Sequence, residues 1–197
     1  MGVRRRAREL AMQALFFLDM RGQSPETGIP LFSKSCALPK KSLPFFSDLV
    51  FGVSHCRAEI DGIIETYSEH WKVGRMSGVD RNVLRIAVFE MLSRTDIPPK
   101  VTINEAIDIG KRFGADESGP FINGILDSVR IAIDAGKLVQ RLSGPAAPDL
   151  SQMVETVDED DETPAKVAIP AFAAVRGKRG VVKRTAAGKA AKKAASE

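Results

Sequence analysis

The chain has 197 residues, of which 44% are hydrophobic and 27% charged, and its formal net charge at pH 7 is +4. This length and composition are typical of a soluble globular domain with a tail, and they exclude a disulfide scaffold. Only two cysteines occur, Cys36 and Cys56, which fits a reducing, cytoplasmic location. No apolar run reaches the ~18 residues that span a bilayer. The basic N-terminus carries Glu9 and Asp19 where a secretory signal would be apolar.

The charges are distributed unevenly along the chain. Residues 155–162 hold six acids and no base, whereas residues 163–197 hold nine bases and one acid. Such a segment cannot bury enough apolar surface to offset the entropy of ordering it, so we expect disorder. A linker begins near Ser143, Gly144 and Pro145. We therefore predict a helical domain over residues 1–142 and a disordered, acidic-then-basic tail over residues 143–197.

Apolar residues recur at helical spacing through most of the first 142 residues. Residues 4–20 form one apolar stripe, and residues 44–70 form two helices with a break near residues 54–57. A polar, proline-containing connection runs between them, from Gly22 to Leu43. Residues 80–95 are apolar over most of the helix circumference, which predicts a central, buried helix.

Two more helices are predicted in the second half of this region. Thr102 and Glu105 have the spacing of a capping box, so we expect a helix to begin there and to end before Gly114. A last helix carries Ile122, Ile125, Leu126, Val129 and Ile133 at helical spacing. No segment shows the convincing alternation of a strand. The fold class is therefore all-α, built from packed helix bundles.

Two features fall outside the apolar stripes, and the first is a run of arginines at the start of the chain: Arg4, Arg5, Arg6 and Arg8. Positive charge at a helix N-terminus is unfavourable by ~0.3 kcal/mol or more per charge, so four arginines there suggest an anionic ligand. On the same helix, Phe16 is expected to project outward beside them. Two alternatives stay open: Phe16 packs under the following loop, and the arginines form an ordinary solvated face.

The second feature is the turn before the last helix, residues 113–121, which supplies two aromatic rings, two glycines and a helix N-terminus. Phe121 lies at the edge of the apolar stripe. There it either completes the rim of the core or stacks on an unpaired base, a contact worth ~1–3 kcal/mol. Asp116 and Glu117 would repel phosphates, but they can accept hydrogen bonds from base edges or cap the helix.

Catalysis, metal binding and nucleotide binding find little support. His55 and Cys56 are adjacent, so on a helix they would point about 100° apart and cannot form a nucleophile–base pair. Together with Cys36 and His70 they show no metal-ligand spacing, and the glycine-rich phosphate-binding motifs are missing. We expect no enzymatic activity and no cofactor.

Five segments match one known family in order and spacing: RRRARELAMQALF at 4–16, DLVFGV at 48–53, VLRIAVFEML at 83–92, VTINEAIDIGKRFG at 101–114 and FINGILDSV at 121–129. In these segments the chain resembles the bacterial transcription antitermination factors of the NusB family. The resemblance implies two packed three-helix bundles plus one extra helix, and a non-enzymatic role. It implies binding to the single-stranded boxA element of nascent ribosomal RNA, as a heterodimer with NusE, the ribosomal small-subunit protein. Other Nus factors and RNA polymerase would complete the antitermination complex.

The resemblance also assigns roles by position. The residues that it implies in RNA binding are Arg4, Arg5, Arg6, Gln13 and Phe16 on the first helix and Phe113, Gly114, Glu117, Ser118 and Phe121 in the turn. Asp80 matches the region that contacts NusE. Pro120 stands where the family pattern has a basic or polar residue, and the tail beyond residue 145 is not part of that pattern.

Other interpretations stay open. Some ribosomal RNA cytosine methyltransferases carry a NusB-like N-terminal domain, but only a low-complexity tail follows here. A helical interaction scaffold that binds a protein without RNA would not need the arginines at 4–6. The sequence does not reveal whether the chain forms a homodimer. The cationic stretch 181–193 either contacts nucleic acid non-specifically, with the acidic run masking it, or is an inert extension.

Overall fold

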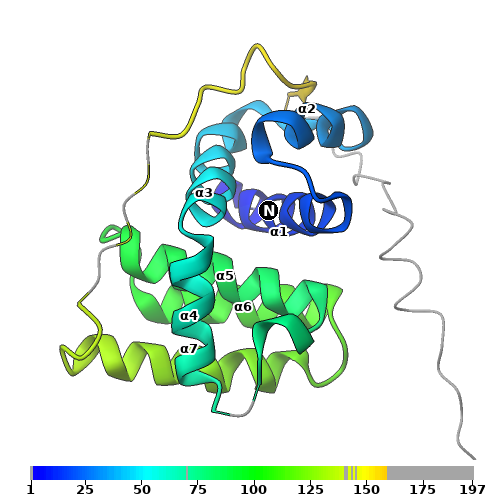
Figure 1. Cartoon of the computed structure of the whole chain (residues 1–197). Coiled ribbons are helices and arrows are strands. Elements are labelled where there is room, and N and C mark those ends of the chain that lie inside the picture. Colours follow the sequence, from blue (N-terminus) through cyan, green and yellow to red (C-terminus); the bar gives the residue numbers. More distant parts are fainter. Residues whose placement is uncertain (1, 70, 140–141, 143, 145, 159–197) are drawn as a thin grey trace, which may run out of the picture. The chain divides into compact units, whose positions relative to one another are not determined.

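The computed structural model describes residues 2–69, 71–139, 142, 144 and 146–158, and this part contains seven α-helices (Figure 1). One bundle consists of α1 (Val3–Arg21), α2 (Pro25–Ser35) and α3 (Leu43–His55). The second consists of α5 (Gly78–Ser93), α6 (Pro99–Phe113) and α7 (Ser118–Asp134), with the extra helix α4 (Arg57–Tyr67) packed on α5 and α7. Two 3-10 turns, η1 (Lys40–Ser42) and η2 (Val73–Arg75), precede α3 and α5. The predicted all-α class is confirmed.

Helix α5 holds the two bundles together. It contacts α1 and α3 of the first bundle as well as α4, α6 and α7. Leu84 and Val88 of α5 have no exposed surface. Where α3 meets α5, Gly52 leaves room for the Phe89 ring, which a side chain at position 52 would overlap. The packing therefore confirms the prediction of a central, buried helix in this segment.

Helix α2 occupies part of the segment predicted as an irregular connection. It begins with Pro25 in its first turn, where the missing N–H has no intrahelical partner to lose. Ile29 and Phe32 are buried, and the Phe32 ring meets Phe17 edge-to-face with centroids 5.8 Å apart. The predicted connection from Gly22 to Leu43 is therefore wrong for α2, because a proline that opens a helix resembles one that excludes it.

Helix ends agree with the prediction except at the start of α6. This helix begins at Pro99, so Thr102 and Glu105 lie inside it and the predicted capping box is wrong. The Thr102 hydroxyl donates instead to the buried carboxylate of Glu90, and Glu105 lies 3.6 Å from a guanidinium nitrogen of Arg8. The two side chains therefore serve contacts between helices.

The chain after α7 returns to the first bundle through residues 146–158, called the strap below (Figure 1). Leu150 is only 2% exposed, and Ser47 Oγ on α3 donates to the Pro148 carbonyl oxygen at 2.8 Å. Strand β2 (Thr156–Val157) pairs in parallel with β1 (Leu38–Pro39). The strap therefore covers part of α3 and the segment after α2.

The strap differs from the disorder expected from residue 143 onward and from the expected absence of strands. A buried leucine and a few main-chain hydrogen bonds dock it, and such sparse contacts do not appear in a composition averaged over the whole tail. The rest of the predicted tail, residues 159–197, lies outside the described residues. In the described part, no helix has the length and apolarity to cross a membrane.

Candidate nucleic-acid interface

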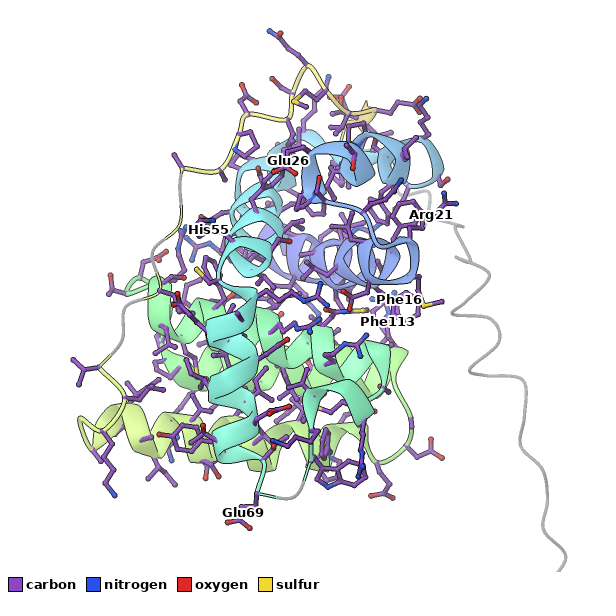
Figure 2. All side chains as sticks on the ribbon, viewed as in Figure 1. Phe16, Arg21, Glu26, His55, Glu69 and Phe113 are labelled. Atoms are coloured by element: carbon purple, nitrogen blue, oxygen red, sulfur yellow. The ribbon has the colours of Figure 1, made fainter. Side chains whose placement is uncertain are left out.

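Side chains of α1 and α6 meet along a seam that carries charges of both signs. Arg5 Nη1 on α1 lies 3.1 Å from Asp108 Oδ2 on α6, and Arg112 Nη1 near the end of α6 lies 2.5 Å from Glu9 Oε1. Arg5, Glu9 and Phe16 are spaced by four and seven residues, so they share one face of α1. The four charged residues define the seam, and Figure 2 labels Phe16 and Phe113 at the same edge of the molecule.

Every arginine of the N-terminal run pairs with a carboxylate. Arg4, Arg5 and Arg6 pair with Asp96, Asp108 and Glu9, at 2.8, 3.1 and 3.6 Å. The side chains of Arg4 and Arg5 are 52% and 37% exposed, and that of Arg6 is 24% exposed. Exposed ion pairs contribute only about 0–1 kcal/mol, so an incoming anion can displace these carboxylates.

Arg8 belongs to the core. It is 5% exposed, and its guanidinium donates to both carboxylate oxygens of Glu90, at 2.9 and 2.8 Å. Glu90 has no exposed surface and lies on the otherwise apolar α5. Arg8 therefore neutralises a buried charge, and only Arg4, Arg5 and Arg6 of the run are available to a ligand.

Phe16 is half-buried and does not project outward as predicted. Its ring covers Gly78 at the start of α5, where an added Cβ would lie 2.6 Å from the ring. The missing side chain of Gly78 gives the ring a place on α5, which the apolar pattern of α1 alone cannot show. Gln13 is 8% exposed, so its side chain offers little surface to a ligand.

Two of the predicted turn residues shape the turn between α6 and α7. The Ser118 hydroxyl is buried and accepts a hydrogen bond from the Ala115 amide at 2.9 Å. The Gly114 amide donates to the Gly110 carbonyl at 2.8 Å, and a Cβ at position 114 would overlap Ser118. Gly114 and Ser118 therefore position the turn and present no free group of their own.

The other predicted turn residues reach the surface. Glu117 is exposed at the N-cap position of α7. Phe113 is half-buried, and the Arg112 guanidinium lies over its ring, 5.1 Å from the centroid. Phe121 is also half-buried, and its ring meets Trp71 edge-to-face with centroids 5.7 Å apart. The turn thus adjoins the seam at Phe113 and carries a second aromatic site at Phe121.

Sequence reasoning missed Trp71, which is 52% exposed. Two signals could have identified it: it is the single tryptophan of the chain, and polar residues flank it between two helices. An indole in such a segment has little apolar sequence around it to bury it.

Asp80, expected at the NusE surface, is only 8% exposed. Its amide donates to Ser77 Oγ at 3.0 Å in the first turn of α5, where a carboxylate suits the helix dipole. Its Oδ1 atom is buried and has no hydrogen-bond partner among the described residues. The structure therefore places Asp80 beneath the surface and away from the arginines of α1.

An open pocket of about 350 Å³ lies among α1, α4, η2 and α5 and is lined by ion pairs. Asp19 lies 3.0 Å from Arg57 and 3.1 Å from both Arg81 and Arg85. Burial alone would raise the pKa of Asp19, but the attraction of Arg57 and Arg85 and a hydrogen bond from Asn82 outweigh it, so the pKa is lowered. These charges compensate one another and leave no reactive group.

The described residues offer no nucleophile or metal site. Burial raises the pKa of the Cys36 thiol, although the positive charge of Arg6 acts in the opposite direction. Burial, followed by the negative charge of Glu59, raises the pKa of the Cys56 thiol. A nucleophilic cysteine needs the opposite shift. No cluster of three His, Cys, Asp or Glu in the described part could hold a metal ion, and His70 lies outside it.

Known proteins resemble the helical part of the chain. The sequence profile of the NusB family matches residues 5–130. The transcription antitermination protein NusB of Desulforapulum autotrophicum is 51% identical over 141 residues, which cover 70% of this chain and 99% of that protein. Its namesake from Myxococcus xanthus is 44% identical over 138 residues, which cover 68% and 99%.

Solved structures show the same similarity. T. maritima NusB has a TM-score of 0.59 at 41% identity and covers 66% of this chain and 91% of its own. A crystal structure of antitermination factors NusB and NusE in complex with dsRNA contains a chain with a TM-score of 0.60 at 28% identity, covering 67% and 98%.

Proposed function

Because the chain belongs to the NusB family, we propose that it is a transcription antitermination factor that binds boxA-type single-stranded RNA of nascent ribosomal RNA transcripts. It binds together with NusE, the ribosomal small-subunit protein, and helps RNA polymerase avoid premature termination. A similar structure is a complex of NusB and NusE with RNA, which supports both partners. The protein is not an enzyme.

One observation carries this proposal: displaceable arginine ion pairs and half-exposed aromatic rings adjoin one another along the seam and the turn. Phosphates can replace the carboxylates of Asp96 and Asp108 on Arg4 and Arg5, since an exposed pair contributes only about 0–1 kcal/mol. A guanidinium also matches a phosphate with two parallel hydrogen bonds. Unpaired bases can then stack on the rings of the turn, the usual mode of sequence-specific RNA recognition.

The partner proposals go further than the surface described above. NusE contacts the start of α5, near Asp80. Other Nus factors and RNA polymerase join the complex in the cytoplasm. A homodimer that covers the arginines of α1 is the competing arrangement, and a solution mass measurement distinguishes it from a monomer. Because Asp80 is buried, Asp80→Lys would disturb the fold, so Asp80→Asn is the better test of NusE association by titration.

The decisive experiment titrates a boxA-type RNA and a scrambled RNA into the full chain, with and without NusE. Phe121→Ala should lower the boxA affinity by roughly 5- to 150-fold, the range of one base-stacking contact. Arg5→Ala should lower it and reduce the slope of log affinity against log salt by about 0.7, the value for one phosphate contact on a single strand.

Arg130→Ala is the matched control. Arg130 also forms exposed ion pairs, with Asp127 and Asp134, but it lies twelve residues after Ser118 on α7, or about 18 Å further along the helix. The circular dichroism of all three variants should match the wild type. If boxA and scrambled RNA bind equally, or if Arg5→Ala and Phe121→Ala bind boxA RNA like the wild type, the proposed RNA surface is wrong.

A further inference from the structure

Trp71 presents an aromatic ring to solvent from a fixed backbone. Its side chain is 52% exposed, and it is the one aromatic residue among the large exposed hydrophobic residues of the described part. The buried Ser68 holds the backbone, because its hydroxyl donates to the Trp71 carbonyl at 2.6 Å and its carbonyl accepts the Trp71 amide at 3.2 Å. The ring is therefore kept in place without being enclosed.

The neighbour of Trp71 is Phe121, the ring that the proposed function assigns to base stacking. The centroids are 5.7 Å apart and the planes meet at 75°, an edge-to-face contact. In this geometry the edge of one ring meets the face of the other, so the pair leaves ring faces uncovered. Two aromatic rings from separate segments, the loop before η2 and helix α7, thus form one exposed site.

Cations flank this aromatic pair. The aliphatic chain of Lys111 lies over Gly119, two residues before Phe121, where an added Cβ would be 3.1 Å from it. Lys72 follows Trp71 directly, and its ammonium forms only an exposed ion pair with Glu65, at 2.9 Å. Aromatic faces with displaceable cations beside them are the features that bind single-stranded nucleic acid, because bases stack while phosphates pair with the cations.

We propose that Trp71 and Phe121 together form a two-ring site for an unpaired base of the RNA bound along α1 and α6. This inference rests on the proposed RNA binding and extends it to a segment outside the arginine helix and the turn. The RNA strand then runs from the arginines of α1, past Phe113, to the far end of the turn, with Lys111 and Lys72 near its phosphates.

The single tryptophan of the chain makes the test direct, because tryptophan fluorescence reports on Trp71 alone. A boxA-type RNA titrated into the full chain should quench this fluorescence, with the same midpoint as binding followed through a label on the RNA. Abasic substitutions along the RNA should abolish the quench at the one position that stacks. Trp71→Leu should weaken binding by roughly 5- to 150-fold, and Trp71→Phe, which keeps a ring, should restore most of the affinity.

Ile131→Ala is the control, since Ile131 is 54% exposed on α7 and matches Trp71 as an exposed apolar residue. Wild-type RNA affinity in Trp71→Leu overturns the inference, and so does fluorescence that responds to NusE alone but not to RNA, which would assign the ring to a protein partner. If Arg5→Ala weakens boxA binding while Trp71→Leu does not, the inference fails and the proposed function stands. If the wild type does not prefer boxA RNA, the proposed function itself fails.

Discussion

Arg5 and Arg8 are three residues apart, yet the structure assigns them to a surface and to the core. Arg8→Met leaves the carboxylate of Glu90, which has no exposed surface, with the Thr102 hydroxyl but without its cation. Breaking a buried ion pair from one side costs ~3–5 kcal/mol. Arg5→Met removes a pair with Asp108 in which both side chains are more than a third exposed, for about 0–1 kcal/mol.

Urea denaturation followed by circular dichroism measures this difference. With a denaturant slope of about 2 kcal/mol per molar, the unfolding midpoint of Arg8→Met should fall by ~1.5–2.5 M and that of Arg5→Met by no more than ~0.5 M. The double variant Arg8→Met, Glu90→Leu should recover much of the loss, because an apolar pair can replace a buried ion pair. Equal midpoints for the two single variants would refute the separation of core and surface arginines.

Three further outcomes follow from the turn, the polar pocket and the strap. Gly114→Ala should lower the thermal midpoint and weaken RNA binding, because its Cβ overlaps Ser118 in the turn. Asp19→Asn should destabilise the fold most at neutral pH. Because the folded pKa of Asp19 is lowered, its contribution to stability is present above the ordinary value of 3.8 and is lost as the pH falls through the folded pKa. Leu150→Ala should cost about 2 kcal/mol in urea unfolding, at the low end for a buried leucine because only the strap's docking can be lost.

Each outcome has a clear contrary result. A Gly114→Ala variant with the wild-type midpoint would show that the turn relaxes around a methyl group. A stability loss in Asp19→Asn that stays constant down to acid pH would mean that its carboxylate is not held by its arginines. Unchanged unfolding of Leu150→Ala would mean that the strap adds nothing to the stability of the first bundle.

The sequence predicted the helices whose apolar stripes are wide, and it failed where few residues decide the structure. The 80–95 segment is apolar on nearly every side, so its central position in the fold follows from its own pattern. Helix α2 buries Ile29 and Phe32 among prolines and polar residues, and the strap docks chiefly through Leu150. These segments acquire their structure from partners distant in the chain, which local periodicity does not reveal.

The candidate site shows the same division. The stripe of α1 placed the arginines outside the apolar face, but it could not distinguish Arg8 from Arg5, since that depends on Glu90 in α5. A carboxylate in a helix predicted to be buried was the available signal, because a buried charge requires a partner. Phe16 lies against Gly78 and Phe121 against Trp71, and neither contact follows from the spacing within one helix.

The last described residue of the strap fixes where the remaining chain departs. Asp158 lies 3.0 Å from Lys40 Nζ of η1, and Ser42 Oγ of η1 donates to the Val3 carbonyl at 3.5 Å, at the start of α1. Covalent attachment at this exit point keeps the nine bases of residues 163–197 within chain length of the arginine end of α1, whatever conformation they adopt. A truncation that isolates their effect should therefore end after Asp158, because cutting the chain earlier would also remove the tether that brings them there.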